Sequence, residues 1–76
     1  MSNKARLQAF VADRLADGRP EHLRANAEKL RGMLRELSEA TGGDRPIPPH
    51  LVGLSAFDLA DAAEALEAAA SQREAA

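Results

Sequence analysis

The chain has 76 residues, no cysteine and a formal net charge of −2. A chain this short buries only about 60% of the surface that its unfolded form exposes, so we expect a single domain over residues 1–76 with a thin margin of stability. Without cysteine, neither a disulfide nor a thiolate metal site can form. The polar start and the lack of a long apolar run argue against a membrane span, and we expect a cytoplasmic protein.

Composition limits the bulk of the core. The chain has 17 alanines but only two aromatic residues, so leucine and alanine must form most of the interior. A core this shallow favours completion by a second copy, as in a homodimer, or by a partner protein. The bias toward alanine, arginine and leucine, with two lysines, is typical of a high-GC bacterial or phage gene.

Charge is distributed unevenly along the chain. Residues 1–45 carry nine Lys/Arg against seven Asp/Glu, whereas residues 46–76 carry one against five. The density of positive charge stays below that of dedicated nucleic-acid binders in both parts. Such a dipolar arrangement would orient a partner or help two copies pair head to tail.

The first predicted element is a helix over residues 4–16, capped by Ser2 or Asn3. An amphipathic spacing of i, i+3, i+4 and i+8 supports it, formed by Leu7, Phe10, Val11 and Leu15. Gly18 is well placed to adopt the left-handed conformation that ends a helix. Pro20 suits the first position of the next helix, although Arg19 before it is a poor cap.

The second predicted element, over residues 20–40, is the longest helix. Its apolar residues are separated by steps of four, three, four and three, and they are Leu23, Ala27, Leu30, Leu34 and Leu37, with Met33 widening the strip. This spacing, which we term the leucine seam, is typical of two helices packed side by side. Gly32 lies opposite the seam and costs about 1 kcal/mol relative to alanine, which we interpret as a tolerated penalty. We hypothesise that the seam forms a dimer or partner contact.

A proline-rich connector follows over residues 44–54. Gly42 and Gly43 end the second helix, and three prolines then force extended backbone at Pro46, Pro48 and Pro49. The PxxP spacing is found in ligands of some signalling modules, but one copy within a small domain favours a structural spacer. The connector's apolar residues are expected to pin it onto the helices: Ile47, Leu51, Val52 and Leu54.

The third predicted helix spans residues 56–71 and has the clearest start signal. Ser55 and Asp58 form a capping box, with Leu54 and Leu59 as the hydrophobic staple. A narrow apolar line continues along this helix through Leu59, Ala63, Leu66 and Ala70, which favours close helix packing. We expect the carboxylates of this helix to form a solvated face and the residues beyond Ser71 to fray.

The residue types give no support for catalysis, a cofactor or a metal site. Carboxylates are numerous, but acid–base catalysis needs two that converge in a pocket with separated proton affinities. The two histidines, His22 and His50, lie 28 positions apart and do not match metal-ligand spacing. Ser55 is accounted for by its capping role. We therefore expect a protein that is not an enzyme.

Three arginines of the second helix lie close together around its axis: Arg24, Arg31 and Arg35. Such a stripe can contact phosphates, but Glu28 lies within it. Pairing of Glu28 with Arg31 and of Arg35 with Glu39 would give a salt-bridged, exposed face, which is the favoured interpretation. A charged partner surface and a nucleic-acid contact remain alternatives.

Phe57 is the apolar residue that fits the helical pattern least. In the third helix it points away from Leu59 and Leu66, toward Asp61 and Glu64. The favoured interpretation is that it folds back over Ile47 or Leu51. The alternative is an exposed anchor for another protein, because aromatic residues are common hot spots of interfaces.

The sequence thus predicts an all-α, three-helix domain with an extended connector. The leading functional hypothesis is a small non-catalytic interaction module, such as a regulator, inhibitor, adaptor or assembly factor, which binds a protein partner or itself through helix surfaces. Its expected contact residues are Leu23, Leu30, Met33, Leu34, Leu37 and Phe57. The alternative is a nucleic-acid-binding regulator that neutralises phosphates with Arg6, Arg14, Arg24, Arg31 and Arg35.

Overall fold

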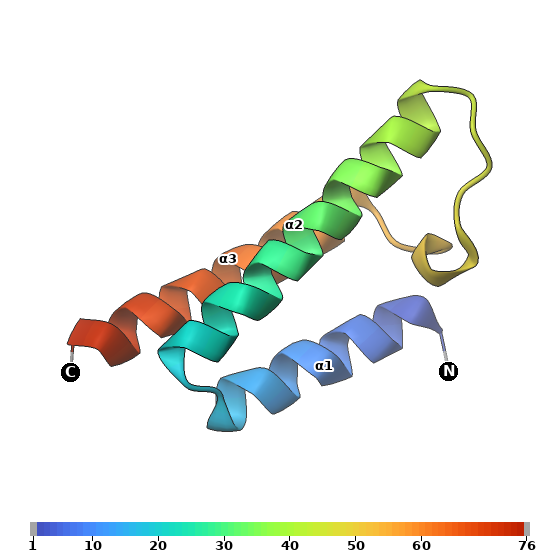
Figure 1. The fold of residues 1–76 in the computed structure, drawn as a ribbon. Helices are drawn as coiled ribbons and strands as arrows, with labels where there is room; N and C mark the ends of the chain where they lie inside the picture. The colour runs from blue at the N-terminus through green and yellow to red at the C-terminus, as the bar shows by residue number, and fades with distance from the viewer. Residues whose placement is uncertain (1, 76) are drawn as a thin grey trace.

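The computed structural model describes residues 2–75, and within this range it contains three α-helices, one 3-10 turn and no strand. The helices are α1 (Asn3–Asp17), α2 (Pro20–Gly42) and α3 (Ala56–Ala75), and the turn η1 (Pro49–Leu51) lies in the connector (Figure 1). The predicted all-α, three-helix fold is confirmed. The predicted helix bounds differ from the observed ones by at most four residues.

The helices are arranged as an antiparallel pair with a third helix beside it. In Figure 1, α2 and α3 run in opposite directions along most of their length, and α1 lies alongside them in the same direction as α3. The last turns of α2 extend beyond the other two helices, and the connector returns from there toward the start of α3. The molecule is elongated, with principal extents of 45 × 24 × 15 Å.

The core lies mainly between α2 and α3. Four leucines have no exposed surface: Leu23 on α2, Leu51 on η1, and Leu59 and Leu66 on α3. Alanines at the α2–α3 contact allow close approach, as the narrow apolar line of α3 predicts. The core is completed by Ala27, Leu30, Leu37, Ala40, Ala62, Ala63 and Ala70. Helix α2 continues unbroken through Gly32, and its seam is one continuous face that is buried except at Met33 and Leu34, which are half-buried.

Helix α1 is attached differently, because none of its residues is fully buried. Its apolar side chains are half-buried against the core. Polar contacts hold its two ends instead. At the start, the Asn3 side-chain amide donates to the carbonyl oxygens of Pro49 and Val52, both at 2.8 Å. At the end, the Arg73 guanidinium of α3 donates to the carbonyl oxygens of Leu15 and Gly18.

The corner between α1 and α2 corrects one prediction. Gly18 is extended, with φ −76° and ψ 140°, so the left-handed conformation expected for it is wrong. Glycine is nevertheless required for space. A Cβ atom at this position would lie 2.6 Å from the Arg14 carbonyl oxygen and 2.7 Å from the Leu23 Cδ2 atom.

The helix starts follow the local signals in the sequence. The Ser2 hydroxyl accepts from the Ala5 N–H at 3.1 Å and caps α1, whereas Arg19 gives α2 no side-chain cap. The predicted capping box of α3 is confirmed. The Ser55 N–H donates to Asp58 Oδ2 at 2.9 Å, and the Asp58 N–H donates to Ser55 Oγ at 3.1 Å.

The connector is anchored by fewer residues than its composition predicts. Leu51 is fully buried and Leu54 is half-buried, as expected for residues that pin the connector onto the helices. Ile47 and Val52, in contrast, are 43% and 56% exposed, so their expected anchoring role is wrong. A short turn at Pro49–Leu51 directs Leu51 alone deep into the core.

The end of α3 is helical where fraying was expected. The helix continues to Ala75, four residues beyond the predicted end. Arg73 bonds to the carbonyls of the α1–α2 corner, and Glu74 accepts from Arg24 of α2. These long-range contacts offset the loss of conformational entropy that would otherwise let a helix end fray.

Candidate interaction surfaces

The leucine seam lies inside the single chain. Leu23, Leu30 and Leu37 are at most 4% exposed because α3 and the connector cover them. In this conformation they are not available to a second molecule, which corrects the hypothesis that the seam forms an external contact. Met33 and Leu34 are half-buried at the edges of the same face.

The arginine stripe of α2 is largely engaged with α3. Arg31 makes two hydrogen bonds to the Glu67 carboxylate, at 2.9 and 2.6 Å, and Arg24 likewise holds Glu74. The expected pairing of Arg31 with Glu28 on the same helix is therefore wrong. Two carboxylates of α3 thus serve as cross-helix partners, whereas Asp61 and Glu64 are exposed, as expected for a solvated face.

The remaining members of the arginine set are also close to carboxylates. Arg35 lies 3.7 Å from Glu28 instead of pairing with Glu39, and Arg14 donates to Asp13 at 2.7 Å. Among residues 2–75, Arg6 is the member of the predicted phosphate-binding set without a carboxylate within 4.0 Å. Internal pairing of this kind competes with phosphate binding and does not favour a nucleic-acid contact.

The cross-helix pairs shift the proton affinities of their members. The hydrogen bonds from Arg31 lower the pKa of Glu67 below its ordinary value, and those from Arg24 do the same for Glu74. The pKa of Asp58 is lowered chiefly by the hydrogen bond from the Ser55 backbone N–H. Each shift favours the charged form of the carboxylate and is explained by a contact within the fold.

An apolar groove lies between α1 and α2, closed at one end by the connector. Its volume is about 300 Å³, which is near the lower end of ligand pockets. Its apolar lining consists of half-buried or buried side chains from all three parts, namely Leu7, Phe10, Leu30, Met33 and Leu54. We call this the α1–α2 groove. Met33 is the one expected contact residue of the seam that lines it without being fully buried.

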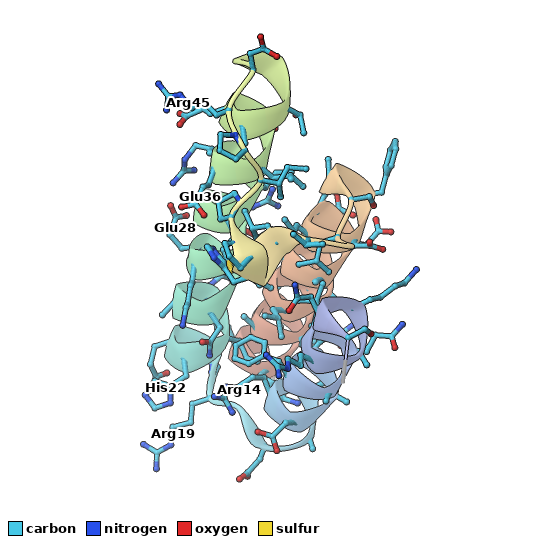
Figure 2. The ribbon with its side chains drawn as sticks, turned by 90° about the vertical axis from the view of Figure 1, so that its right-hand side faces the viewer. Arg14, Arg19, His22, Glu28, Glu36 and Arg45 are labelled. Carbon is cyan, nitrogen blue, oxygen red and sulfur yellow. The ribbon has the colours of Figure 1, made fainter. Side chains whose placement is uncertain are left out.

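Basic side chains surround the α1–α2 groove. Arg6 of α1 and Lys29 of α2 line it, and neither has a carboxylate within 4.0 Å among the described residues. His50 also lines it, with its Nε2 atom 2.9 Å from Glu36 Oε1. At the far end, the Arg14 guanidinium stacks over the Phe10 ring, with its Cζ atom 4.7 Å from the ring centroid. Arg14, Arg19 and His22 lie near one another at this corner of the molecule (Figure 2). The groove therefore combines an apolar floor with a positive rim.

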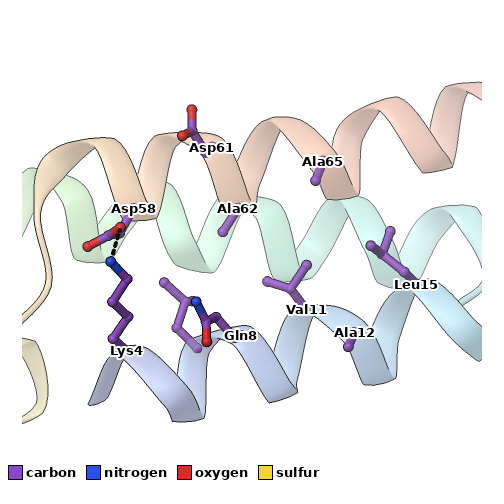
Figure 3. Close-up of a pocket in the computed structure, with 10 residues that line it drawn as sticks. Lys4, Gln8, Val11, Ala12, Leu15, Asp58, Asp61, Ala62 and Ala65 are labelled. Atoms are coloured by element: carbon purple, nitrogen blue, oxygen red, sulfur yellow. Dashed lines mark ion pairs between the residues drawn. The ribbon is translucent and has the colours of Figure 1, made fainter. Parts of the chain in front are cut away.

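A second groove, of about 360 Å³, separates α1 from α3 (Figure 3). Val11 and Leu15 of α1 face Ala62 and Ala65 of α3 across it. The ion pair between Lys4 and Asp58, at 3.8 Å, bridges one end. Because a basic and an acidic side chain already meet across this groove, its rim does not carry charge of one sign, unlike the rim of the α1–α2 groove.

Phe57 is the most exposed large apolar side chain among the described residues, at 80%. The favoured expectation that it folds back over Ile47 or Leu51 is therefore wrong. Its exposure is consistent with the alternative, an exposed aromatic anchor. Phe57 lies in the first turn of α3, which the Ser55–Asp58 capping box holds in place. Its backbone is thus fixed while its ring faces solvent.

Sequence reasoning considered Asn3 only as a helix cap and Arg6 only as a phosphate contact, and it missed Lys29; it placed none of the three at a groove. Their roles depend on where α1 lies against α2 and on the path of the connector, and neither is encoded in a local spacing. The residues that the structure describes contain no group of three or more potential metal ligands. None of the described helices is both long enough and apolar enough to cross a bilayer.

Comparison of the chain with known protein families, with curated proteins and with solved structures found no match.

Proposed function

We propose that this chain is a small non-catalytic interaction module that binds a protein partner, or a second copy of itself, through helix surfaces. The observation that carries the proposal is the 80% exposure of Phe57 on a capped helix. Burying an aromatic side chain removes about 150–250 Å² from water, and such residues are enriched among interface hot spots. A rigid backbone beneath the ring lowers the entropy lost on binding.

Charge pairing favours this function over nucleic-acid binding. Arg24 and Arg31, which were central to the alternative, hold Glu74 and Glu67 within the same chain. Contacting phosphates would require these pairs to break.

Site-specific photo-crosslinking tests the proposal directly. Benzoylphenylalanine replaces Phe57 in one variant and Gln72, an exposed residue near the other end of α3, in a matched control. Both variants are irradiated as purified protein and in a lysate of the source cells. We expect position 57 to give a discrete crosslinked product, either a dimer or an adduct with one other protein, that position 72 does not give. Equal or absent crosslinking at the two positions would contradict the proposal.

A further inference from the structure

The exposed face of α3 combines an aromatic residue with unpaired acids. Phe57, Asp61, Glu64 and Ala68 follow the i, i+4, i+7 and i+11 spacing of one helix face, and all four are exposed. Neither Asp61 nor Glu64 has a basic group within 4.0 Å among the described residues. We call this the acidic face of α3. It presents one large apolar side chain followed by two negative charges.

The α1–α2 groove has the complementary chemistry. It is apolar at its floor, is large enough for an aromatic ring, and carries Arg6 and Lys29 without carboxylate partners among residues 2–75. Glu36 is the nearby acid, and its Oε1 atom lies 2.9 Å from the His50 Nε2 atom. The two unpaired cations of the groove thus match the two unpaired acids of α3 in number and are opposite in sign.

We propose that the α1–α2 groove is the docking site for the acidic face of α3 of a second copy. Phe57 of one copy enters the groove of the other, and Asp61 and Glu64 approach Lys29 and Arg6. The inference rests on the proposed function and names its partner. The overall charge supports a second copy as the occupant, since residues 1–45 are net positive and residues 46–76 are net negative.

The two complementary surfaces belong to different helices, so each copy carries one anchor and one groove. A contact between these two surfaces either forms twice, related by a two-fold axis, in a closed isologous dimer, or forms once per pair of copies and continues head to tail as a heterologous contact. In both cases the mass in solution rises above 8.1 kDa with concentration. Added salt weakens the association, because charges at the rim of an interface are screened.

Analytical ultracentrifugation of three proteins tests the inference. The wild-type chain is compared with Phe57→Ala, which lacks the anchor, and with the double variant Arg6→Glu/Lys29→Glu, which reverses the charge of the groove. We expect each variant alone to raise the dissociation constant by about tenfold or more, equivalent to about 1.4 kcal/mol. Val52→Ala, which truncates another exposed apolar residue, is the matched control and should leave the constant unchanged.

Mixing the two deficient variants gives the decisive result. Phe57→Ala retains an intact groove, and Arg6→Glu/Lys29→Glu retains an intact anchor, so one contact re-forms and a heterodimer appears. Circular dichroism and thermal unfolding of each variant establish that it is folded. A wild-type chain that stays monomeric at millimolar concentration, or a mixture without heterodimer, would overturn the inference. Crosslinking of position 57 to a different protein would then leave the proposed function standing.

Discussion

The α2–α3 pair and α1 are held in the fold by different forces. Every core residue of the described helices belongs to α2 or α3, and Leu51 of the connector completes the set. Helix α1 contributes half-buried side chains and is held by polar contacts near its ends. The difference teaches that a periodic apolar stripe predicts a helix but does not predict how deeply that helix is buried.

Truncation of one core-facing leucine in each region should show the largest contrast. Leu66→Ala removes a side chain with no exposed surface, so we expect the free energy of unfolding to fall by about 2–5 kcal/mol. Leu15→Ala in α1 should cost about half as much, because Leu15 is only half-buried. Urea unfolding followed by circular dichroism measures both values. Equal losses would show that α1 belongs to the same core.

The corner that joins the two regions gives the next effect. Gly18→Ala places a methyl group 2.6 Å from the Arg14 carbonyl oxygen and 2.7 Å from Leu23 Cδ2, and we expect a loss of about 1–3 kcal/mol. Gly32→Ala is the matched control. Its methyl group meets only the Arg35 guanidinium at 3.7 Å, so it should increase stability by about 1 kcal/mol through helix propensity. Thermal unfolding distinguishes the two, and a gain for Gly18→Ala would mean that the corner can relax freely.

The polar attachment of α1 can be tested alone. Asn3→Ala removes two hydrogen bonds to the connector and should cost about 1 kcal/mol. We expect the backbone amides of α1 to exchange hydrogen faster, while those of α2 and α3 keep their protection. Hydrogen exchange followed by NMR resolves the helices. Faster exchange throughout the chain would indicate that α1 opens only with the rest.

The smallest expected effect is the pH dependence of the α2–α3 contact. Because the pKa values of Glu67 and Glu74 lie below their ordinary value of 4.5, their ion pairs contribute stability above that pH. This contribution is lost as the pH falls through the lowered values. The unfolding temperature of the wild-type chain should therefore drop below about pH 4.5.

The matched variants for the pH dependence are Glu67→Gln and Glu39→Gln. Glu39 has no basic group within 4.0 Å among the described residues. Glu67→Gln should make the acid-side decrease in unfolding temperature shallower, whereas Glu39→Gln should leave it unchanged. If the unfolding temperature falls equally steeply with pH in both variants, the Arg31–Glu67 pair is not the cause of the decrease.

Local signals in the sequence predicted the local structure well. The Ser55–Asp58 capping box spans three residues, and its two hydrogen bonds are those that the pattern predicts. The leucine seam predicted one buried face along α2, because helical periodicity alone determines which residues share a face. Gly18 was predicted at the correct boundary but for the wrong reason. The sequence suggested a left-handed conformation, whereas the structure needs glycine because a Cβ atom would be crowded by Leu23, and that crowding depends on tertiary packing.

The features that sequence could not predict depend on register between distant segments. Arg31 and Glu67 are 36 positions apart, so their pairing follows from the antiparallel alignment of α2 and α3. The orientation of Phe57 away from the core was readable from the helical wheel. Its exposure was not, because it depends on the path of a connector that has no periodic pattern.

The attachment of α1 to α3 has a consequence for folding during synthesis. Helix α1 leaves the ribosome before α3, which supplies Arg73 and the surface that faces α1. Helix α1 can therefore complete its contacts only after α3 has been synthesised. Until α3 emerges, the apolar sides of both earlier helices lack the surface that covers them in the folded chain.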